Sequence, residues 1–233
     1  MSLKYLRLLT WLGMTALAGC GGGGGDAGSA TSPQATSYPL LAAYKASLVA
    51  GASTSYSVSG TCSGTATLSS APTVAANFEG VAGYSSVQTA SMALTNCTPA
   101  NSSTSSVDYY DANYTPLGTA TVGEEYAAFK TAATALAASV RVGDSSTVGT
   151  MTLYADSTKS VTTGVRVLSY AVESDTATTA IVNFIAKDYD TANNLLSTQQ
   201  ARYRLGTDGS LTASTIDVQN STTSTTHLVF TKK

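Results

Sequence analysis

The residues best suited by type and spacing to bind a metal ion lie in one short segment, Asp188-x-Asp190-x-x-Asn193. Carboxylate and amide oxygens suit Ca²⁺, but an EF-hand loop also needs a ligand at its fifth position, glycine at its sixth and glutamate at its twelfth. Those positions hold Ala192, Asn193 and Gln199. Because Asp and Asn also concentrate in hairpin turns, Asp188, Asp190 and Asn193 are weak metal candidates, and no metal site is predicted.

Residues for acid–base or nucleophilic chemistry are equally sparse. The only histidine, His227, could serve as a general base, but a lone strand histidine is more often a hydrogen-bonded surface residue. Arg202 and Arg204 point to the same side of one predicted strand, where they could bind an anion or pair with an acid such as Asp217. No Gly-x-Ser-x-Gly elbow is present. The sequence therefore predicts no enzyme and no cofactor other than a covalent lipid.

That lipid is indicated by the N-terminal residues. Lys4 and Arg7 precede a short apolar stretch, and Leu17-Ala18-Gly19-Cys20 follows it. The stretch is shorter than the roughly 20 apolar residues that span a bilayer, so residues 1–19 are predicted to be an export signal. Leu17-Ala18-Gly19-Cys20 resembles the lipobox of bacterial lipoproteins. The Cys-Gly-rich start also resembles uncharacterised envelope lipoproteins of Gram-negative bacteria, which carry no known activity.

The lipoprotein resemblance implies a route to the membrane. The sulfur of Cys20 would receive a diacylglyceryl group, the signal peptide would be cleaved ahead of it, and the new amino group can then be acylated, with palmitate for example. Two or more acyl chains hold a protein stably on a bilayer. Gly21 stands where, in Gram-negative sorting, an aspartate would favour retention in the inner membrane, so the expected location is the outer membrane. Which side of that membrane the protein faces stays open.

The other two cysteines, Cys62 and Cys97, form an even pair once Cys20 is lipidated. In an oxidising envelope compartment a disulfide is the expected outcome. A metal site would need more ligands, and a nucleophilic cysteine would need a base, for which His227 is the one candidate. We therefore predict a Cys62–Cys97 disulfide.

Composition excludes some partners. Residues 20–233 carry ten basic and 14 acidic residues, and this acidic balance argues against nucleic acid and against docking on anionic lipid through basic clusters. Tyrosine is frequent, and Tyr109, Tyr110 and Tyr114 surround one predicted hairpin. Amphipathic aromatic residues suit contact surfaces, although they also suit strands for packing reasons alone. These tyrosines are a possible contact surface for an envelope protein partner.

The remaining sequence predicts the elements that position these residues. Residues 20–38 are a Gly/Ser-rich tether, and residues 39–233 form one mainly β (α+β) domain. It combines a disulfide unit over about 54–122 with an antiparallel meander over about 145–231. Six strands are expected in the meander, at residues 148–155, 164–173, 178–188, 195–205, 210–218 and 225–231. One or two short helices, at 39–49 and 123–140, should pack on the sheet. Gly123 starts the second, and Glu124 and Glu125 lie where a helix N-terminus favours negative charge.

Two strands of the meander, 165–172 and 180–186, carry apolar residues on both faces. They should lie centrally and be covered by a helix or by the N-terminal strands. This pattern fits a solid core and a ligand cavity equally well. Two functions therefore remain open for a lipid-anchored envelope protein: a non-enzymatic binding or structural role, or the carriage of a hydrophobic ligand such as a lipid.

Overall fold

A computed structural model describes residues 35–221 and 226–233. The predicted signal peptide, Cys20 and most of the predicted tether lie outside the described residues. The described part is mainly β, with a single helix and 13 strands. The elements are α1 Leu40–Ala50, β1 Ala52–Gly60, β2 Ser63–Ser70, β3 Val74–Phe78, β4 Val81–Thr95, β5 Asn101–Asp111, β6 Pro116–Thr121, β7 Glu125–Phe129, β8 Ser145–Tyr154, β9 Thr162–Ser174, β10 Thr179–Tyr189, β11 Leu195–Gly206, β12 Leu211–Asn220 and β13 Thr226–Lys232.

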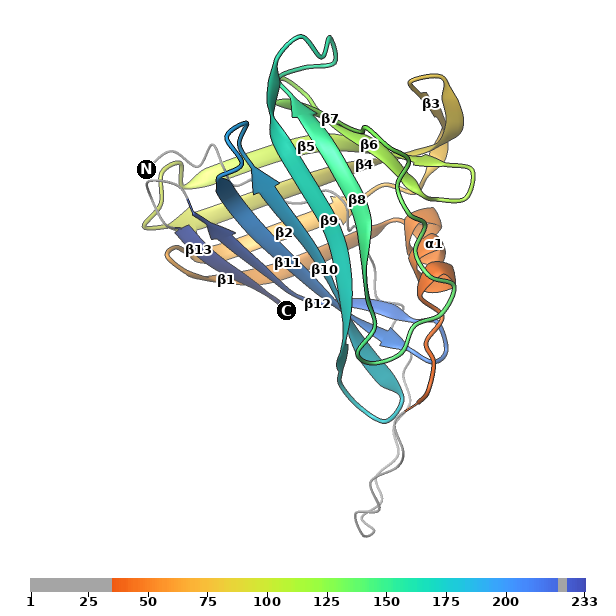
Figure 1. The fold of residues 1–233 in the computed structure, drawn as a ribbon. Helices are drawn as coiled ribbons and strands as arrows, with labels where there is room; N and C mark the ends of the chain where they lie inside the picture. Colours follow the sequence, from red (N-terminus) through yellow and green to blue (C-terminus); the bar gives the residue numbers. More distant parts are fainter. Residues whose placement is uncertain (1–34, 222–225) are drawn as a thin grey trace.

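The strands form a closed antiparallel barrel (Figure 1). From β4 to β13 each strand pairs with the next along the chain; β13 then pairs with β1, β1 with β2, and β2 with β4. The β2–β4 pairing closes the ring of 12 strands. The remaining strand, β3, pairs only with the first residues of β4. Closure removes the exposed sheet edges that an open meander would leave.

Alternation along each strand sends one side chain in two into the barrel. In β9 the buried positions are Gly164, Arg166, Leu168, Tyr170 and Val172, and the intervening residues are at least partly exposed. The same period recurs in the other long strands. Most inward positions are apolar, so the interior is a contiguous hydrophobic core. Arg166 is an exception to that rule.

Helix α1 closes one end of the barrel (Figure 1). Both ends of α1 are hydrogen-bonded to loops at this end of the barrel. Thr73 donates its backbone N–H to the carbonyl oxygen of Leu48, and Leu41 donates its backbone N–H to the carbonyl oxygen of Ala137. Tyr44 reaches from α1 into the interior, where its ring lies 6.5 Å from that of Tyr110 on β5. The aromatic end of the core is therefore built around the helix.

Much of the predicted order is confirmed. The helix expected at 39–49 is α1, and the six strands expected in the meander are β8 to β13, with ends shifted by a few residues. The predicted hairpin around Asp111 is the β5–β6 pair. Both predicted units, 54–122 and 145–231, contribute strands to the same barrel. In these segments local pattern and turn chemistry agree with the tertiary fold.

The helix predicted at 123–140 is wrong. Residues 125–129 form β7, which pairs with β6 and β8, and the following residues are irregular. Their backbone groups bond to neighbouring segments, as when Thr134 donates to Val148 and Val140 exchanges hydrogen bonds with Tyr38. Leu136 and Val140 are buried, as the helical spacing predicts, but they lie in an irregular segment. Tertiary pairing has overridden a spacing that fits a helix.

The expected cover over the two central strands is also wrong. The second apolar face of β10, carrying Ile181 and Ile185, is the outer wall of the barrel, where both side chains are half-buried. Helix α1 instead packs against the interior core. The apolar spacing of these strands thus reflects their position in a barrel wall, where the two faces meet different environments.

Candidate functional site: a buried ion cluster

The strongest concentration of charge inside the barrel is a cluster of Glu125, Arg166 and Asp188. Arg166 lies on β9 directly opposite Asp188 on β10. Its Nε donates to Asp188 Oδ1 at 2.7 Å and its Nη2 donates to Oδ2 at 2.8 Å. Two parallel bonds from one guanidinium fix both the distance and the plane of the carboxylate. The antiparallel register therefore builds a bidentate pair on the inner wall.

Glu125 supplies a second carboxylate from β7, with Oε1 3.2 Å from Arg166 Nη1. The side chains of Arg166, Asp188 and Glu125 are 8, 12 and 4% exposed, so the cluster is largely shielded from water. Burial disfavours the charged guanidinium, but Asp188 and then Glu125 outweigh it and raise the pKa of Arg166 above its ordinary value. Arg166 thus stays charged.

The cluster belongs to a polar row that continues around the inner wall. Asp188 lies opposite Ser197 on β11, and Ser197 lies opposite Asn220 on β12. Directly opposed residues share a face of the sheet, so all three side chains face the interior. The row lies near the ends of β9 to β12 that are remote from α1, where the 189–195 turn joins β10 to β11. The ion cluster therefore lies toward the end of the barrel that is remote from α1.

The outer wall carries a separate polar network over β9, β10 and β11. Asn183 Nδ2 donates to Glu173 Oε1 and to Gln200 Oε1, each at 2.9 Å. Arg202 Nη2 donates to the same Gln200 oxygen at 3.0 Å, and its Nε lies 3.5 Å from Glu173 Oε2. Because Arg202 and Glu173 are substantially exposed, solvent screens this ion pair.

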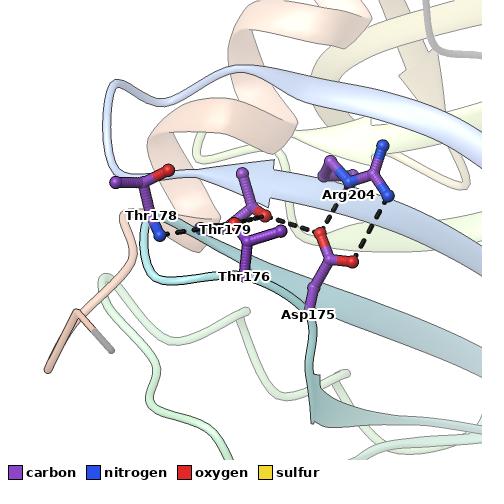
Figure 2. A network of polar contacts seen from close by, with 5 residues as sticks. All are labelled: Asp175, Thr176, Thr178, Thr179 and Arg204. Atoms are coloured by element: carbon purple, nitrogen blue, oxygen red, sulfur yellow. Dashed lines mark hydrogen bonds and ion pairs between the residues drawn. The ribbon is translucent and has the colours of Figure 1, made fainter. Parts of the chain in front are cut away.

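A second arginine contact lies beside the β9–β10 turn (Figure 2). Arg204 Nε donates to Asp175 Oδ2 at 2.6 Å, and Thr179 donates its hydroxyl to the same oxygen at 2.5 Å. The threonine hydroxyls at 176 and 179 lie 2.6 Å apart. The hydrogen bonds from Arg204 and then Thr179 lower the pKa of Asp175. The contact holds the turn against β11 and is too exposed at Arg204, 52%, to form an enclosed site.

The predicted ion-pair partners are thereby corrected. Arg202 and Arg204 do share the outer face, but their acids lie on the other side of β11 from Asp217: Glu173 is on β9, and Asp175 is in the turn that follows β9. Asp217, the partner proposed from the sequence, instead lies 3.1 Å from His227. The reason is register, because Asp217 lies opposite Gln200 and not opposite an arginine.

The weak metal candidates do not converge. Asp188 faces the interior and is held by Arg166, whereas Asp190 caps the β10–β11 turn by accepting from the backbone N–H groups of Ala192 and Asn194. Asn193 takes a left-handed conformation in that turn, with φ of 65°. Asp190 and Asn193 thus stabilise the turn, which is a common role of Asp and Asn. Among residues 35–221 and 226–233, no three His, Cys, Asp or Glu side chains gather as a metal site.

The three tyrosines do not form one contact surface. Strand alternation places Tyr109 and Tyr110 on opposite faces of β5. Tyr109 is on the outer wall with its ring 4.6 Å from Phe78, and Tyr110 is 1% exposed in the core. Tyr114 stacks on Tyr84 at the rim, with ring centroids 4.6 Å apart. Tyr110 is therefore unavailable to a partner, and the other two already contact aromatic neighbours.

His227 is an exposed strand residue, as predicted. Its Nε2 lies 3.1 Å from Asp217 Oδ2, and its side chain is 52% exposed. Its backbone N–H donates to Thr61 Oγ1. The pair lies on the outer wall, separate from the buried cluster.

Cys62 and Cys97 form a disulfide, with Cα atoms 5.8 Å apart and 35 residues between them. They join the β1–β2 and β4–β5 turns at the end of the barrel remote from α1. Replacing both with serine should lower the free energy of unfolding by about 3–4 kcal/mol, because the unfolded chain regains the entropy of an open loop. Urea unfolding of the oxidised wild type and the double variant measures this. An unchanged midpoint in urea would contradict it.

Sequence reasoning missed Arg166 and gave Glu125 the wrong role. Glu125 had been assigned to the start of a helix, whereas its side chain enters the barrel. The sequence did contain a sign of the cluster, because Arg166 is the one charged residue on the otherwise apolar inward face of β9. A charge at such a position requires a buried partner.

In the part of the chain that the structure describes, no helix is long and apolar enough to cross a bilayer. Searches with family models, curated proteins and solved structures give no match to this chain.

Proposed function

We propose that this chain is a lipid-anchored protein of the bacterial cell envelope, held at the outer membrane through Cys20, with a non-enzymatic binding role. The lipobox-like residues support the anchor. The binding role is supported by one observation, the buried cluster of Glu125, Arg166 and Asp188 inside the barrel. Burying charges costs folding free energy, and residues that break the pattern of a core are expected at functional sites.

The alternative role, carriage of a hydrophobic ligand, has weaker support. A barrel is a suitable container for an apolar molecule, and the aromatic end lies beneath a separate helix. However, Tyr44, Phe184 and Tyr203 are each at most 1% exposed and occupy that end. A lipid would have to displace α1 before it could enter. Saturable binding of a dye that fluoresces in apolar cavities to the wild type would favour the carrier.

The anchor is tested by replacing Cys20 with serine in the full chain. Oxygen cannot accept the thioether-linked lipid, so we expect the variant to leave the membrane fraction, whereas the wild type stays with it until detergent is added. Cell fractionation measures this, and mass spectrometry of the mature N-terminus reports acylation.

The Cys62→Ser/Cys97→Ser variant is the matched control, because it removes thiols from the same chain without touching the lipobox. It should remain with the membrane. An unacylated N-terminus on the wild type, or a Cys20→Ser chain that stays equally membrane-bound, would refute the anchor.

A further inference from the structure

Closure of the barrel leaves one strand, β3, with a free edge. In the described chain β3 pairs with β4 alone and stands at the end of the strand order, outside the closed ring (Figure 1). An unpaired edge presents a row of backbone N–H and C=O groups, and such a row can pair with the backbone of another chain. The edge of β3 is therefore a candidate interaction surface.

The β3–β4 turn decides which backbone groups of β3 are free. Phe78 and Val81 flank the two-residue turn Glu79-Gly80, in which both residues have positive φ. The residues that flank such a turn form a hydrogen-bonded pair, and bonded and non-bonded pairs then alternate along the two strands. Ala75 and Asn77 are therefore not bonded to β4, and their N–H and C=O groups point to the open side. Both residues are exposed.

The edge is uncharged and partly apolar. Proteins commonly protect an edge strand with charged side chains or proline, but residues 74–78 contain neither. Val74 is 63% exposed, and Ala76 and Phe78 follow it on the same face by the two-residue period of a strand. Val81 lies opposite Phe78 and is 45% exposed. Free backbone groups thus border a small apolar strip.

The strand that carries this edge is fixed to the outer wall of the barrel. The ring of Phe78 packs against those of Tyr109 and Tyr126, with centroids 4.6 and 5.5 Å away. Tyr126 donates its hydroxyl to Glu79 Oε1 at 2.6 Å, and Lys159 forms an ion pair with the same carboxylate. A surface that is already ordered loses less conformational entropy when a partner binds. The edge is therefore prepared for binding.

We propose that β3 binds an extended segment of another polypeptide, added as an antiparallel strand with uncharged apolar side chains at every second position. Only an extended backbone repeats donors and acceptors at the spacing of the edge, and residues opposite Val74 and Ala76 would cover the apolar strip.

A second folded copy of the chain fits this edge less well than a flexible segment does. The five residues of β3 make an edge about 17 Å long. A stable interface between folded proteins buries roughly 1,200–2,000 Å², which is far more than one short edge supplies. The inference goes beyond the binding role proposed above, because it concerns the outside of the barrel and does not involve the buried cluster.

The probe is the fluorescein-labelled peptide Thr-Val-Thr-Val-Thr-Val, added to the full-length chain in detergent. With its valines over Val74 and Ala76, the threonine N–H groups point to β3 and the valine N–H groups point to solvent. The peptide N-methylated on its valines should bind saturably by fluorescence anisotropy. Its isomer N-methylated on the threonines should bind at least about tenfold more weakly, because the bonds to Ala75 and Asn77 are blocked.

Two pairs of variants locate the site. Ala75→Pro removes a free N–H donor and should weaken binding of the valine-methylated peptide at least about tenfold, whereas Ala75→Thr keeps the donor and should bind like the wild type. Val74→Lys places a charge on the apolar strip and should also weaken binding. Val142→Lys is its control, since Val142 is 38% exposed in the loop before β8. Bound peptide should slow amide hydrogen exchange at Ala75 and Asn77.

Equal affinity for the two methylated isomers would overturn the proposal, as would no saturable binding of the valine-methylated peptide or full affinity in Val74→Lys. A wild type that sediments as a dimer, with Ala75→Pro a monomer, would assign the edge to a second copy and also refute it. If Ala75→Pro fails to fold by circular dichroism, the two isomers and Val74→Lys still decide the matter. A negative result with Cys20 still acylated would reject the peptide site and leave the anchor standing.

Discussion

Replacing Arg166 with methionine should lower the free energy of unfolding by about 3–5 kcal/mol, the range for breaking a buried ion pair. Methionine retains much of the side-chain length but donates no hydrogen bond. It leaves the Asp188 and Glu125 carboxylates, 12 and 4% exposed, without their shared cation. The urea midpoint of the variant, followed by circular dichroism, measures the loss.

Two controls separate this effect from the loss of any arginine. Arg204→Met removes an arginine that is 52% exposed on the outer wall and should cost at most about 1 kcal/mol, because water screens that pair. Adding Glu125→Gln and Asp188→Asn to Arg166→Met removes all three charges, and should recover part of the lost stability. Equal losses for Arg166→Met and Arg204→Met would show that the inner cluster contributes no more than a surface pair.

The elements that could be predicted are those whose local signals agree. In β11 and β12, alternating side chains flank the Asp208-Gly209 turn, and both strands form as expected. The Asp208 carboxylate accepts from the backbone N–H of Ser210, which is the local bond that favours Asp in such turns. Strand alternation and turn chemistry are both short-range properties, and a single sequence contains them in full.

Closure of the barrel could not be predicted in this way. It depends on β1 pairing with β13 and β2 with β4, and no local pattern specifies which distant strand a strand will meet. The 123–140 segment failed for a related reason. Tyr126 and Phe129 fit one face of a helix, but residues 125–129 lie between β6 and β8, whose free backbone groups they satisfy.

The sequence pointed to one member of the candidate site, Asp188, but not to its partner Arg166. Asp188 was singled out, but for metal binding with Asp190, whereas alternation sends its carboxylate into the barrel toward Arg166. Neighbouring acids in sequence suggested a shared ligand. In a strand the neighbour that matters lies across the sheet, so the partner on β9 became evident only with the register.

The second large effect is expected at the other end of the barrel, where Tyr44→Ala should lower the free energy of unfolding by about 3–5 kcal/mol, as for other large-to-small changes in cores. Tyr44 is 0% exposed, and its ring lies 6.2 Å from Phe184 and 6.5 Å from Tyr110. Alanine would leave a cavity between strands that cannot move together, because they belong to a closed wall. Urea unfolding measures the loss.

Val49→Ala is the matched control, since Val49 is on the same helix but 54% exposed, and its change should stay within about 0.5 kcal/mol. The Tyr44→Ala variant also distinguishes the two proposed roles. If the interior is a solid core, a dye that fluoresces in apolar cavities should bind only the variant, whose cavity is new. If the wild type binds the dye equally well, apolar molecules already pass α1 and enter the barrel. That result would favour the carrier role over a solid core.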